Sequence, residues 1–156
     1  MILATLVYVV QDDKVLMIHR NQRPDDLHFD KYNGLGGKFE EGESPRQCAI
    51  RELKEESGLD ALELAFKGHL LFPKFDKHGR DWLVFIYTVH HFKGELIKLN
   101  HEGELKWIPI GKILELNLWE GDQLFIPHVF SNSQFEGTIT YQNGKVTAHE
   151  IFLSLN

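Results

Sequence analysis

The sequence predicts an α+β fold in one domain, residues 1–156, and three observations support this prediction. Apolar runs with the β-branched and aromatic content of strands recur along the chain, and one segment carries both a helix start and a helix stop. Near the end, Asn143-Gly144 separates two further strand-like runs, which is the strongest short signal for a β-hairpin. We therefore expect a sheet, a few helices and a C-terminal β-hairpin.

The chain is expected to begin with two strands, residues 1–10 and 15–19, joined by the polar turn 11–14. The apolar opening run has neither a basic first region nor a small-residue cleavage site, so we interpret it as a buried strand rather than a signal peptide. Residues 20–31 are expected to form a polar loop, the kind of segment in which binding residues tend to lie.

A helix is delimited between Ser44 and Gly58. Ser44 is a favourable N-cap, Pro45 suits the first helical position, and Gln47 completes a Ser-x-x-Gln capping box. Gly58 ends the helix because glycine readily adopts the left-handed conformation that follows a last turn. The helix should therefore have about thirteen residues, an ordinary length.

The second half of the chain is expected to alternate strands with short helices. Pro109 should stop one strand, and Pro127 should kink or end the second helix. The expected strands are 62–72, 82–92 and 105–108, the expected helices are 111–116 and 123–129, and the expected hairpin comprises 134–141 and 145–153.

Composition and charge exclude several classes of protein. No apolar run approaches the roughly 18 residues that span a bilayer, so we expect no membrane partner. The net charge is −6 and no run is rich in lysine or arginine, so a nucleic-acid polymer is not an expected partner. A single cysteine, Cys48, excludes an internal disulfide and suits the reducing cytoplasm, where we expect the protein to act.

The helix carries a cluster of carboxylates. Glu52, Glu55 and Glu56 fall within an arc of about 100°, since each helical residue advances by about that angle. Like charges at this spacing repel one another and destabilise a helix. Mg²⁺ removes that repulsion, because it prefers oxygen ligands and typically uses carboxylates together with substrate phosphates. Arg51 can hold one carboxylate through a two-pronged hydrogen bond.

An acidic helix face is more often plain solvated surface, but the wider pattern makes that alternative weak here. Residues 37–59 read glycine, five free positions, glutamate, seven free positions, then Arg-Glu-apolar-any-Glu-Glu-any-Gly-apolar. From average amino-acid usage, a chance match is on the order of one in a billion per starting position. This stretch resembles the Nudix box at every defining position.

The resemblance implies an α/β/α sandwich with a mixed central sheet and a hydrolase of nucleoside diphosphates linked to another group. It implies Mg²⁺, with Mn²⁺ as a substitute, held by the Gly37 carbonyl, Glu52, Glu55 and Glu56. Glu52 is also a candidate for the base that activates water, and Arg51 would brace the helix.

Relatives often supply a further metal-binding or catalytic glutamate from the loop that corresponds to residues 94–103. Glu102 is the better candidate from its position relative to Trp107, and Glu104 is the reserve. Solvated loop glutamates are the alternative interpretation.

The segment before the box, residues 32–38, resembles that of MutT-like enzymes, which remove oxidised purine nucleoside triphosphates. By that likeness Asn33 would hydrogen-bond the base. Lys38 is a candidate for neutralising a phosphate, and so are Arg20 and Arg23 in the preceding loop, although all three also suit a solvated surface.

Residues 118–122, followed by Pro127, resemble the Trp-x-x-Asp segment of the same enzymes. The likeness implies that Trp119 stacks on the base and that Asp122 hydrogen-bonds it. The animal enzymes carry two successive acids where this chain has Gly121 and then Asp122. One of their base-reading carboxylates therefore has no counterpart here.

The expected reaction is in-line attack of water on phosphorus, converting a nucleoside triphosphate such as 8-oxo-dGTP to the monophosphate and pyrophosphate. The alternative is hydrolysis of ADP-ribose or another nucleotide sugar, which the position of Pro73 favours. A nucleotide-sensing module without catalysis is a third reading, disfavoured because every box carboxylate is present.

The partner is expected to be a small nucleotide, bound by a monomer or a homodimer. Phe66, Phe72 and Phe75 are candidates for the wall of a base pocket.

Overall fold

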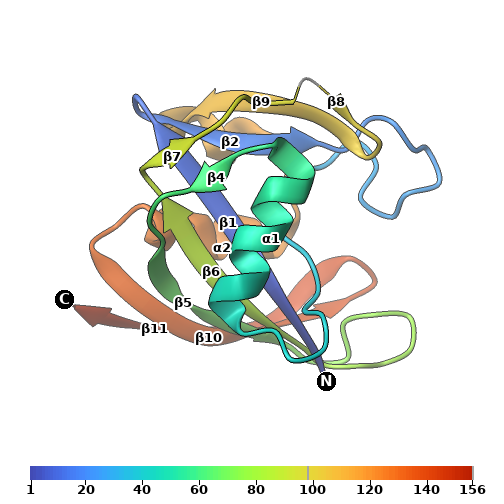
Figure 1. The fold of residues 1–156 in the computed structure, drawn as a ribbon. Helices are drawn as coiled ribbons and strands as arrows, with labels where there is room; N and C mark the ends of the chain where they lie inside the picture. Colours follow the sequence, from blue (N-terminus) through green and yellow to red (C-terminus); the bar gives the residue numbers. More distant parts are fainter. Residues whose placement is uncertain (98, 156) are drawn as a thin grey trace.

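The computed structural model describes residues 1–97 and 99–155. Its centre is a mixed sheet in the order β11-β10-β5-β6-β1-β2-β9-β8, with β3 paired to β2 outside this path, and β4 pairs with β7 in a separate small sheet (Figure 1). The strands are β1 (Ile2–Gln11), β2 (Lys14–His19), β3 (Tyr32–Asn33), β4 (Asp60–Ala61), β5 (Ala65–Phe72), β6 (Trp82–Val89), β7 (Phe92–Lys93), β8 (Leu99–Asn100), β9 (Gly103–Pro109), β10 (Ser133–Gln142) and β11 (Lys145–Leu155). The helices are α1 (Pro45–Ser57), the 3₁₀ helix η1 (Ile110–Glu115) and α2 (Glu120–Val129).

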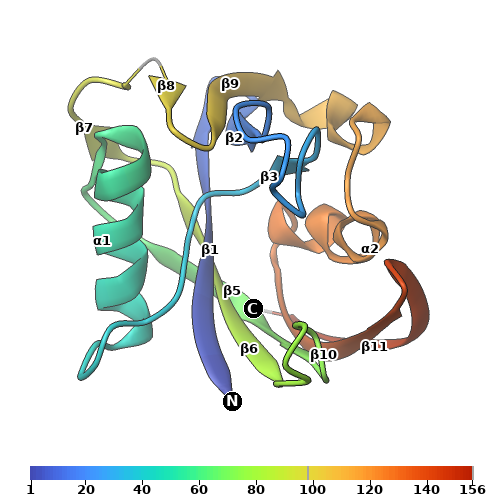
Figure 2. The same cartoon turned by 90° about the vertical axis from the view of Figure 1, so that its right-hand side faces the viewer.

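Helices cover both faces of the sheet, as the predicted sandwich requires. Figure 2 shows α1 on one side of the strands and α2 on the other. The alternation of β1 sends Val7 into the core beneath α1 and Tyr8 into the core beneath α2. Leu53 of α1 and Phe125 of α2 are fully buried in these two cores. The mixed sheet and the sandwich expected from the sequence are therefore confirmed.

Strands β1 and β2 form the expected hairpin only next to their turn. They pair antiparallel at Val10–Val15 and Gln11–Lys14, and then they separate. From there β1 pairs in parallel with β6, while β2 pairs with β9. Residues 35–38 take the vacated place beside β1, through bridges at Ala4–Lys38 and Val7–Leu35. The fold thereby brings the glycine-rich segment against the sheet and under α1.

Local signals in the sequence correspond closely to the ends of α1. Ser44 accepts a hydrogen bond from the Gln47 amide, and the Gln47 side chain accepts one from the Ser44 amide. Gly58 adopts the left-handed conformation with φ of 82° and donates its amide hydrogen to the Lys54 carbonyl. The capping box and the glycine stop are both confirmed.

The C-terminal hairpin is also confirmed, with Asn143 and Gly144 at φ of 52° and 78° in its turn. Helix α2 differs from expectation: it begins at Glu120 rather than residue 123, and it continues past Pro127 to Val129. Strand β9 is longer than expected at both ends. Within the described residues, no helix is long and apolar enough to cross a membrane.

Candidate active site

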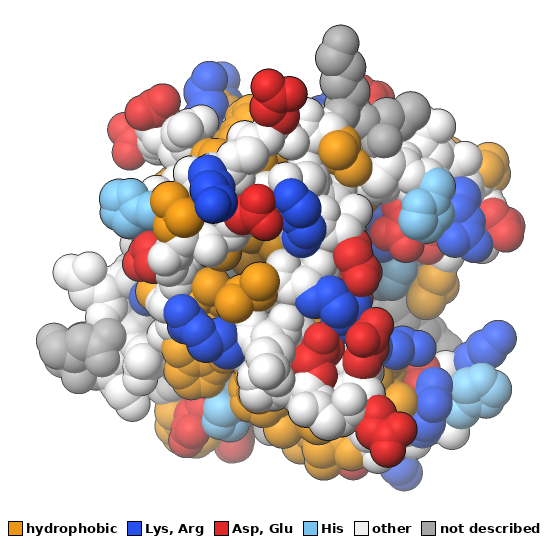
Figure 3. Space-filling model, viewed as in Figure 1, with side chains coloured by type: hydrophobic (Ala, Val, Ile, Leu, Met, Phe, Trp, Pro, Cys, Tyr) orange, Lys and Arg blue, Asp and Glu red, His pale blue; other side chains and the backbone are white. Residues whose placement is uncertain are grey.

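A cavity of about 630 Å³ opens between the glycine-rich segment, α1 and the loop before β9. On the face seen in Figure 3, acidic and basic side chains gather beside α1. The glycine-rich segment contributes Gly36, Gly37 and Lys38 to the lining, and loop 20–31 contributes Arg20. Five carboxylates line the same cavity, and they belong to Glu40, Glu52, Glu55, Glu56 and Glu102.

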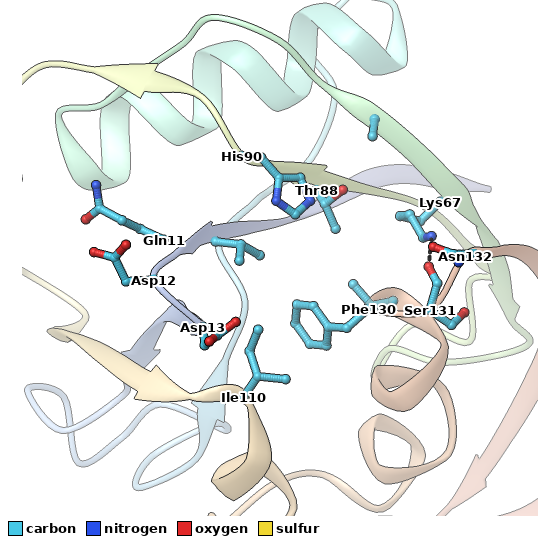
Figure 4. Close-up of a pocket in the computed structure, with 13 residues that line it drawn as sticks. Gln11, Asp12, Asp13, Lys67, Thr88, His90, Ile110, Phe130, Ser131 and Asn132 are labelled. Atoms are coloured by element: carbon cyan, nitrogen blue, oxygen red, sulfur yellow. Dashed lines mark hydrogen bonds between the residues drawn. The ribbon is translucent and has the colours of Figure 1, made fainter.

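A larger cavity, about 890 Å³, lies on the α2 side of the sheet (Figure 4). Gln11, Asp12 and Asp13 lie at one end of it, and Lys67 lies at the other, where its ammonium group donates to the Ser131 carbonyl at 2.6 Å. This cavity contains neither the box carboxylates nor the glycine-rich segment. We therefore place the candidate active site in the smaller, acidic cavity.

Glu56 is the most buried carboxylate of the acidic cavity. Its Oε1 accepts a hydrogen bond of 2.7 Å from the Gly36 amide. Burial raises the pKa of Glu56 to about 8, and the neighbouring charges of Glu52 and Glu102 act in the same direction. A nearby cation would strongly favour the ionised form of a carboxyl group in this environment.

Arg51 holds the other box carboxylates in place. It donates two hydrogen bonds to Glu43, of 2.7 and 2.9 Å, and further ones to Glu52 at 2.8 Å and Glu55 at 3.2 Å. It also donates to the Lys38 carbonyl at 3.0 Å, which ties α1 to the glycine-rich segment. The hydrogen bonds from Arg51 lower the pKa of Glu43 to about 2. The bracing role expected for Arg51 thus has a geometric basis.

The backbone of the glycine-rich segment alternates between two partners. The Gly37 carbonyl accepts the Thr5 amide at 2.9 Å and the Cys48 thiol at 3.5 Å, so it faces β1. The Gly36 amide points the opposite way, to Glu56. The segment therefore faces the acids through Gly36 and the sheet through Gly37. The Gly37 carbonyl, predicted to be a metal ligand, is thus already bonded to β1.

Gly37 matters instead because it leaves room for a carboxylate. A Cβ atom at this position would lie 2.5 Å from the carboxyl carbon of Glu52. Any side chain there would push Glu52 out of the cavity.

Glu102 and Arg20 come together at the mouth of the cavity. A guanidinium nitrogen of Arg20 lies 3.3 Å from Glu102, and its Nε donates to Asp26 at 2.8 Å. Arg20 is therefore largely neutralised by the chain's own acids. Glu104, the reserve candidate, accepts a hydrogen bond from Asn21 and does not line the cavity.

Of the other two cations expected at phosphates, only Lys38 lines the acidic cavity. The Arg23 side chain is half exposed, lies 4.0 Å from Asp25 and does not line the cavity. Lys38 does line it, and its ammonium group lies 5.3 Å from the centre of the Trp82 ring.

The residues of the cavity fit a hard divalent metal. In residues 1–97 and 99–155, no three acidic, histidine or cysteine side chains already converge as a metal cage. Arg51 and the Gly36 amide currently hold the carboxylates, which would turn toward an ion. The available donors are carboxylate and carbonyl oxygens, the ligands that Mg²⁺ and Mn²⁺ prefer. Burial and the neighbouring carboxylates raise the pKa of Glu56, and the same ion would offset both effects.

A second polar region lies between the sheet and α2, where Trp119 is held from two sides. Its indole nitrogen donates a hydrogen bond of 2.7 Å to Nδ1 of His28. The Lys31 ammonium group lies 4.9 Å from the ring centre and donates to Asn117 and to the Leu118 carbonyl. The indole is thus fixed in orientation before any ligand arrives.

Asn33 and Asp122 are both half-buried, and the segments that carry them meet where the Tyr32 amide donates to the Asn117 carbonyl at 3.0 Å. Within the described chain, neither the Asn33 amide nor the Asp122 carboxylate has a hydrogen-bond partner. Burial raises the pKa of Asp122 to about 7, although the Lys31 charge opposes the shift. The Tyr8 ring lies against Gly34, since a Cβ there would touch it, and the pKa of Tyr8 is raised by burial and then by the charge of Asp122. We call the group formed by Asn33, Trp119, Asp122, His28, Lys31 and Tyr141 the base-side region.

Sequence reasoning did not identify three members of the base-side region, namely His28, Lys31 and Tyr141. The Tyr141 ring packs edge-on to Trp119 at 6.5 Å, but a tyrosine in an alternating strand carries no signal that would distinguish it. Phe72 and Phe75, which were candidates for a pocket wall, both contact Tyr141. Phe66 packs instead on Phe85 and Tyr87, at the opposite face of the sheet.

Comparison with known proteins agrees with this geometry. The NUDIX domain model matches residues 2–129. The chain is 34% identical over 146 residues to an oxidized purine nucleoside triphosphate hydrolase of Danio rerio, covering 92% of this chain and 89% of that protein. The Mus musculus protein of the same name is 31% identical over 141 residues, covering 90% and 87%. A crystal structure of a MutT mutator protein from Bacillus halodurans superposes with a TM-score of 0.85 at 28% identity, covering 97% of both chains. The chain therefore belongs to the Nudix family and is a Nudix hydrolase.

Proposed function

We propose that this chain is a Mg²⁺-dependent pyrophosphohydrolase of oxidised purine nucleoside triphosphates such as 8-oxo-dGTP, releasing the monophosphate and pyrophosphate. One observation carries the proposal: a single short segment joins the base-side region to the acidic cavity. Asn33 follows Tyr32, whose amide donates to the Asn117 carbonyl two residues before Trp119, and Gly36 lies three residues later with its amide on Glu56. Three extended residues span at most about 10 Å. That length suits a substrate whose base and phosphates are separated by a sugar.

The acidic cavity would hold the metal through Glu52, Glu55, Glu56 and Glu102 together with a backbone carbonyl. We assign that carbonyl to Gly36 rather than Gly37, because the Gly37 oxygen is bonded to Thr5. Bound there, Mg²⁺ would shield the charge of the phosphate oxygens that are attacked and released.

The chain's own side chains would position the water and take its proton. Glu52 is held in one orientation by Arg51 at 2.8 Å, and Glu102 by Arg20 at 3.3 Å. Either carboxylate can accept a proton from a water in the cavity. Lys38 lines the cavity and would neutralise a phosphate, whereas Arg20 would act mainly by orienting Glu102. A phosphate role for Arg23 would need contact beyond the cavity.

The base would lie on Trp119, with Asn33 and Asp122 at its edge. Two half-buried polar groups without partners are costly unless a ligand satisfies them, which supports a base at this position. The Danio rerio and Mus musculus relatives are named for oxidised purine nucleoside triphosphates, which supports the same class of substrate.

We also propose that the protein acts in the cytoplasm, as a monomer or a homodimer, on free nucleotides rather than polymers. The single thiol, Cys48, is buried and burial raises its pKa to about 11, which suits a protein without disulfides. The net charge of −6 disfavours approach to duplex DNA.

A panel of nucleotides tests the proposal. Purified protein is incubated with 8-oxo-dGTP, dGTP or ADP-ribose, with Mg²⁺ or with EDTA, and the products are separated by ion-exchange chromatography. We expect Mg²⁺-dependent release of pyrophosphate, with 8-oxo-dGTP the preferred substrate. Cleavage of ADP-ribose alone would favour the nucleotide-sugar alternative. Tight binding of nucleotides without turnover would favour a sensing module.

A further inference from the structure

Gly121 lies where the first turn of α2 meets the C-terminal hairpin. Its amide donates a hydrogen bond of 2.6 Å to the hydroxyl oxygen of Tyr141. A Cβ atom at Gly121 would lie only 2.4 Å from that same oxygen. The Tyr141 hydroxyl therefore occupies the space that a side chain at position 121 would need.

Tyr141 projects from β10 into the base-side region. Its ring lies edge-on to Trp119 at 6.5 Å and contacts Phe72 and Phe75 on its other sides. These aromatic contacts fix the ring, so the hydroxyl is held at the Gly121 amide, between Trp119 and Asp122 in the chain. Burial and the charge of Asp122 raise the pKa of Tyr141, which keeps the hydroxyl protonated.

The Tyr141 hydroxyl has one hydrogen-bonding function left. Its oxygen already accepts the Gly121 amide, so what remains is chiefly donation of its own hydrogen. Among the residues that the structure describes, no acceptor receives that hydrogen, and Asp122 is not bonded to it. A donor held beside the indole, with no partner, is suited to a ligand that presents an acceptor.

We propose that Tyr141 is a specificity-determining residue, whose hydroxyl donates a hydrogen bond to the carbonyl oxygen at position 6 of a purine base. A carbonyl oxygen accepts this bond, whereas the amino group of an adenine-type base cannot. The chain would thus prefer 6-oxo over 6-amino purines. The inference rests on the proposed function for the location of the base, but it concerns binding and does not require turnover.

The test compares dITP with dATP, which differ in the 6-position and in the protonation of the adjacent ring nitrogen. Dissociation constants are measured by tryptophan fluorescence in EDTA, and kcat/KM is measured with Mg²⁺, for wild type and Tyr141→Phe. We expect wild type to prefer dITP and the variant to lose about three- to tenfold of that preference, the usual effect of one neutral hydrogen bond. The matched control is Tyr87→Phe, which removes a hydroxyl on the α1 side and should leave the preference unchanged.

The two readouts separate this inference from the proposed function. If dITP binds preferentially and Tyr141→Phe removes the preference without any hydrolysis, the inference holds and the proposed reaction fails. If both nucleotides are hydrolysed and Tyr141→Phe leaves their ratio at the wild-type value, the inference is wrong and the reaction stands. Absence of purine binding by wild type would overturn the inference as well.

A stability cycle tests the contact itself. Gly121→Ala should lower Tm in wild type, because its Cβ meets the hydroxyl oxygen. The same change should lower Tm less in Tyr141→Phe, where that oxygen is gone. Equal losses in both backgrounds would show that the hydroxyl does not fill this space and would overturn the inference.

Discussion

The acidic cavity and the base-side region are built in opposite ways. Most of the cavity comes from one contiguous stretch, residues 37–59, and its charges are bonded to one another through Arg51. The base-side region is assembled from four distant segments, and its Asn33 and Asp122 side chains have no hydrogen-bond partner within the described residues. The comparison teaches that, under the proposed function, the metal-binding part is encoded locally, whereas the base-binding part depends on how the whole chain folds. Substitutions in the two regions should therefore affect different kinetic constants.

The largest effect is expected from Glu56→Gln in the cavity. Glutamine retains an acceptor for the Gly36 amide but carries no charge to hold a cation. We expect kcat to fall by roughly 10²- to 10³-fold, the usual effect of removing one electrostatic contact to a transition state. Tm at pH 7 to 8 should not fall, because the raised pKa of Glu56 means that ionising it costs stability above pH 4.5. Turnover like that of wild type would remove Glu56 from the metal site.

Arg51→Ala sharpens the comparison by removing the centre of the cavity's charge network. Glu43, Glu52 and Glu55 would lose their common partner, so we expect the free energy of unfolding to fall. Activity should fall about 10- to 100-fold, as for residues that orient metal ligands. Urea denaturation and initial rates measure the two effects.

The control for Arg51 is Arg80→Ala. Arg80 bonds Asp76 at the same 2.7 Å distance, but it lies in the exposed loop between β5 and β6. It should cost no more than about 1 kcal/mol and leave kcat unchanged. Equal losses for the two variants would contradict a special role for the Arg51 network.

Trp119→Ala should act on KM rather than on kcat. Stacking of a base on an aromatic ring is worth about 1 to 3 kcal/mol, so we expect KM for purine substrates to rise about tenfold or more. Steady-state kinetics with 8-oxo-dGTP measures this. An unchanged KM would assign Trp119 to packing and would remove the distinction between the two regions.

The smallest effect is expected from His28, which holds the indole of Trp119. Burial, followed by the charge of Arg20, lowers the pKa of His28 from its ordinary 6.5, so the ring is neutral at pH 7 and its Nδ1 can accept. Protonation below that lowered pKa would break the hydrogen bond. KM of wild type should therefore rise only as the pH falls through this lowered pKa, which lies below 6.5.

In His28→Ala, KM should be about two- to threefold higher at pH 7, as expected for loss of one hydrogen bond, and its dependence on pH should be weaker. The linkage has a definite sign: the unfolded chain takes up the proton first, so stability falls as the pH drops from 6.5 through the lower folded pKa. Identical pH profiles of KM for the two proteins would contradict the tether.

Much of the fold was predictable because its signals are local. The ends of α1 follow from Ser44, Gln47 and Gly58, and the C-terminal turn follows from Asn143 and Gly144. The parallel pairing of β1 with β6 joins residues about 80 positions apart, and no nearby pattern encodes it. The two-residue strands β4, β7 and β8 are too short to show a period.

The early start of α2 also escaped prediction, for a reason that bears on function. Trp119 is its N-cap and makes no side-chain cap, and Gly121 in the first turn is a poor helix former. Packing of Gly121 against the Tyr141 hydroxyl fixes this end of the helix instead. Tertiary contact therefore outweighs local propensity at this point.

The candidate site likewise has one part that the sequence predicts and another part that depends on the fold. The carboxylates of the box could be assigned from their spacing, and the structure brings Glu102 to them. The pairing of the Gly37 carbonyl with Thr5 of β1 could not be predicted, because it depends on how residues 35–38 lie against a distant strand. The neutralisation of Arg20 by Asp26 and Glu102 could not be predicted either, because it depends on how loop 20–31 folds back.

Binding of Mn²⁺ in the presence of a non-hydrolysable purine nucleoside triphosphate tests the central claim most directly. Free Mn²⁺ is followed by electron paramagnetic resonance during titration of wild type and Glu56→Gln. We predict that wild type with nucleotide removes Mn²⁺ from solution stoichiometrically and that the variant binds it at least tenfold more weakly. If wild type leaves the ion free, or if the two proteins bind it equally, the acidic cavity is not the metal site and the account is wrong.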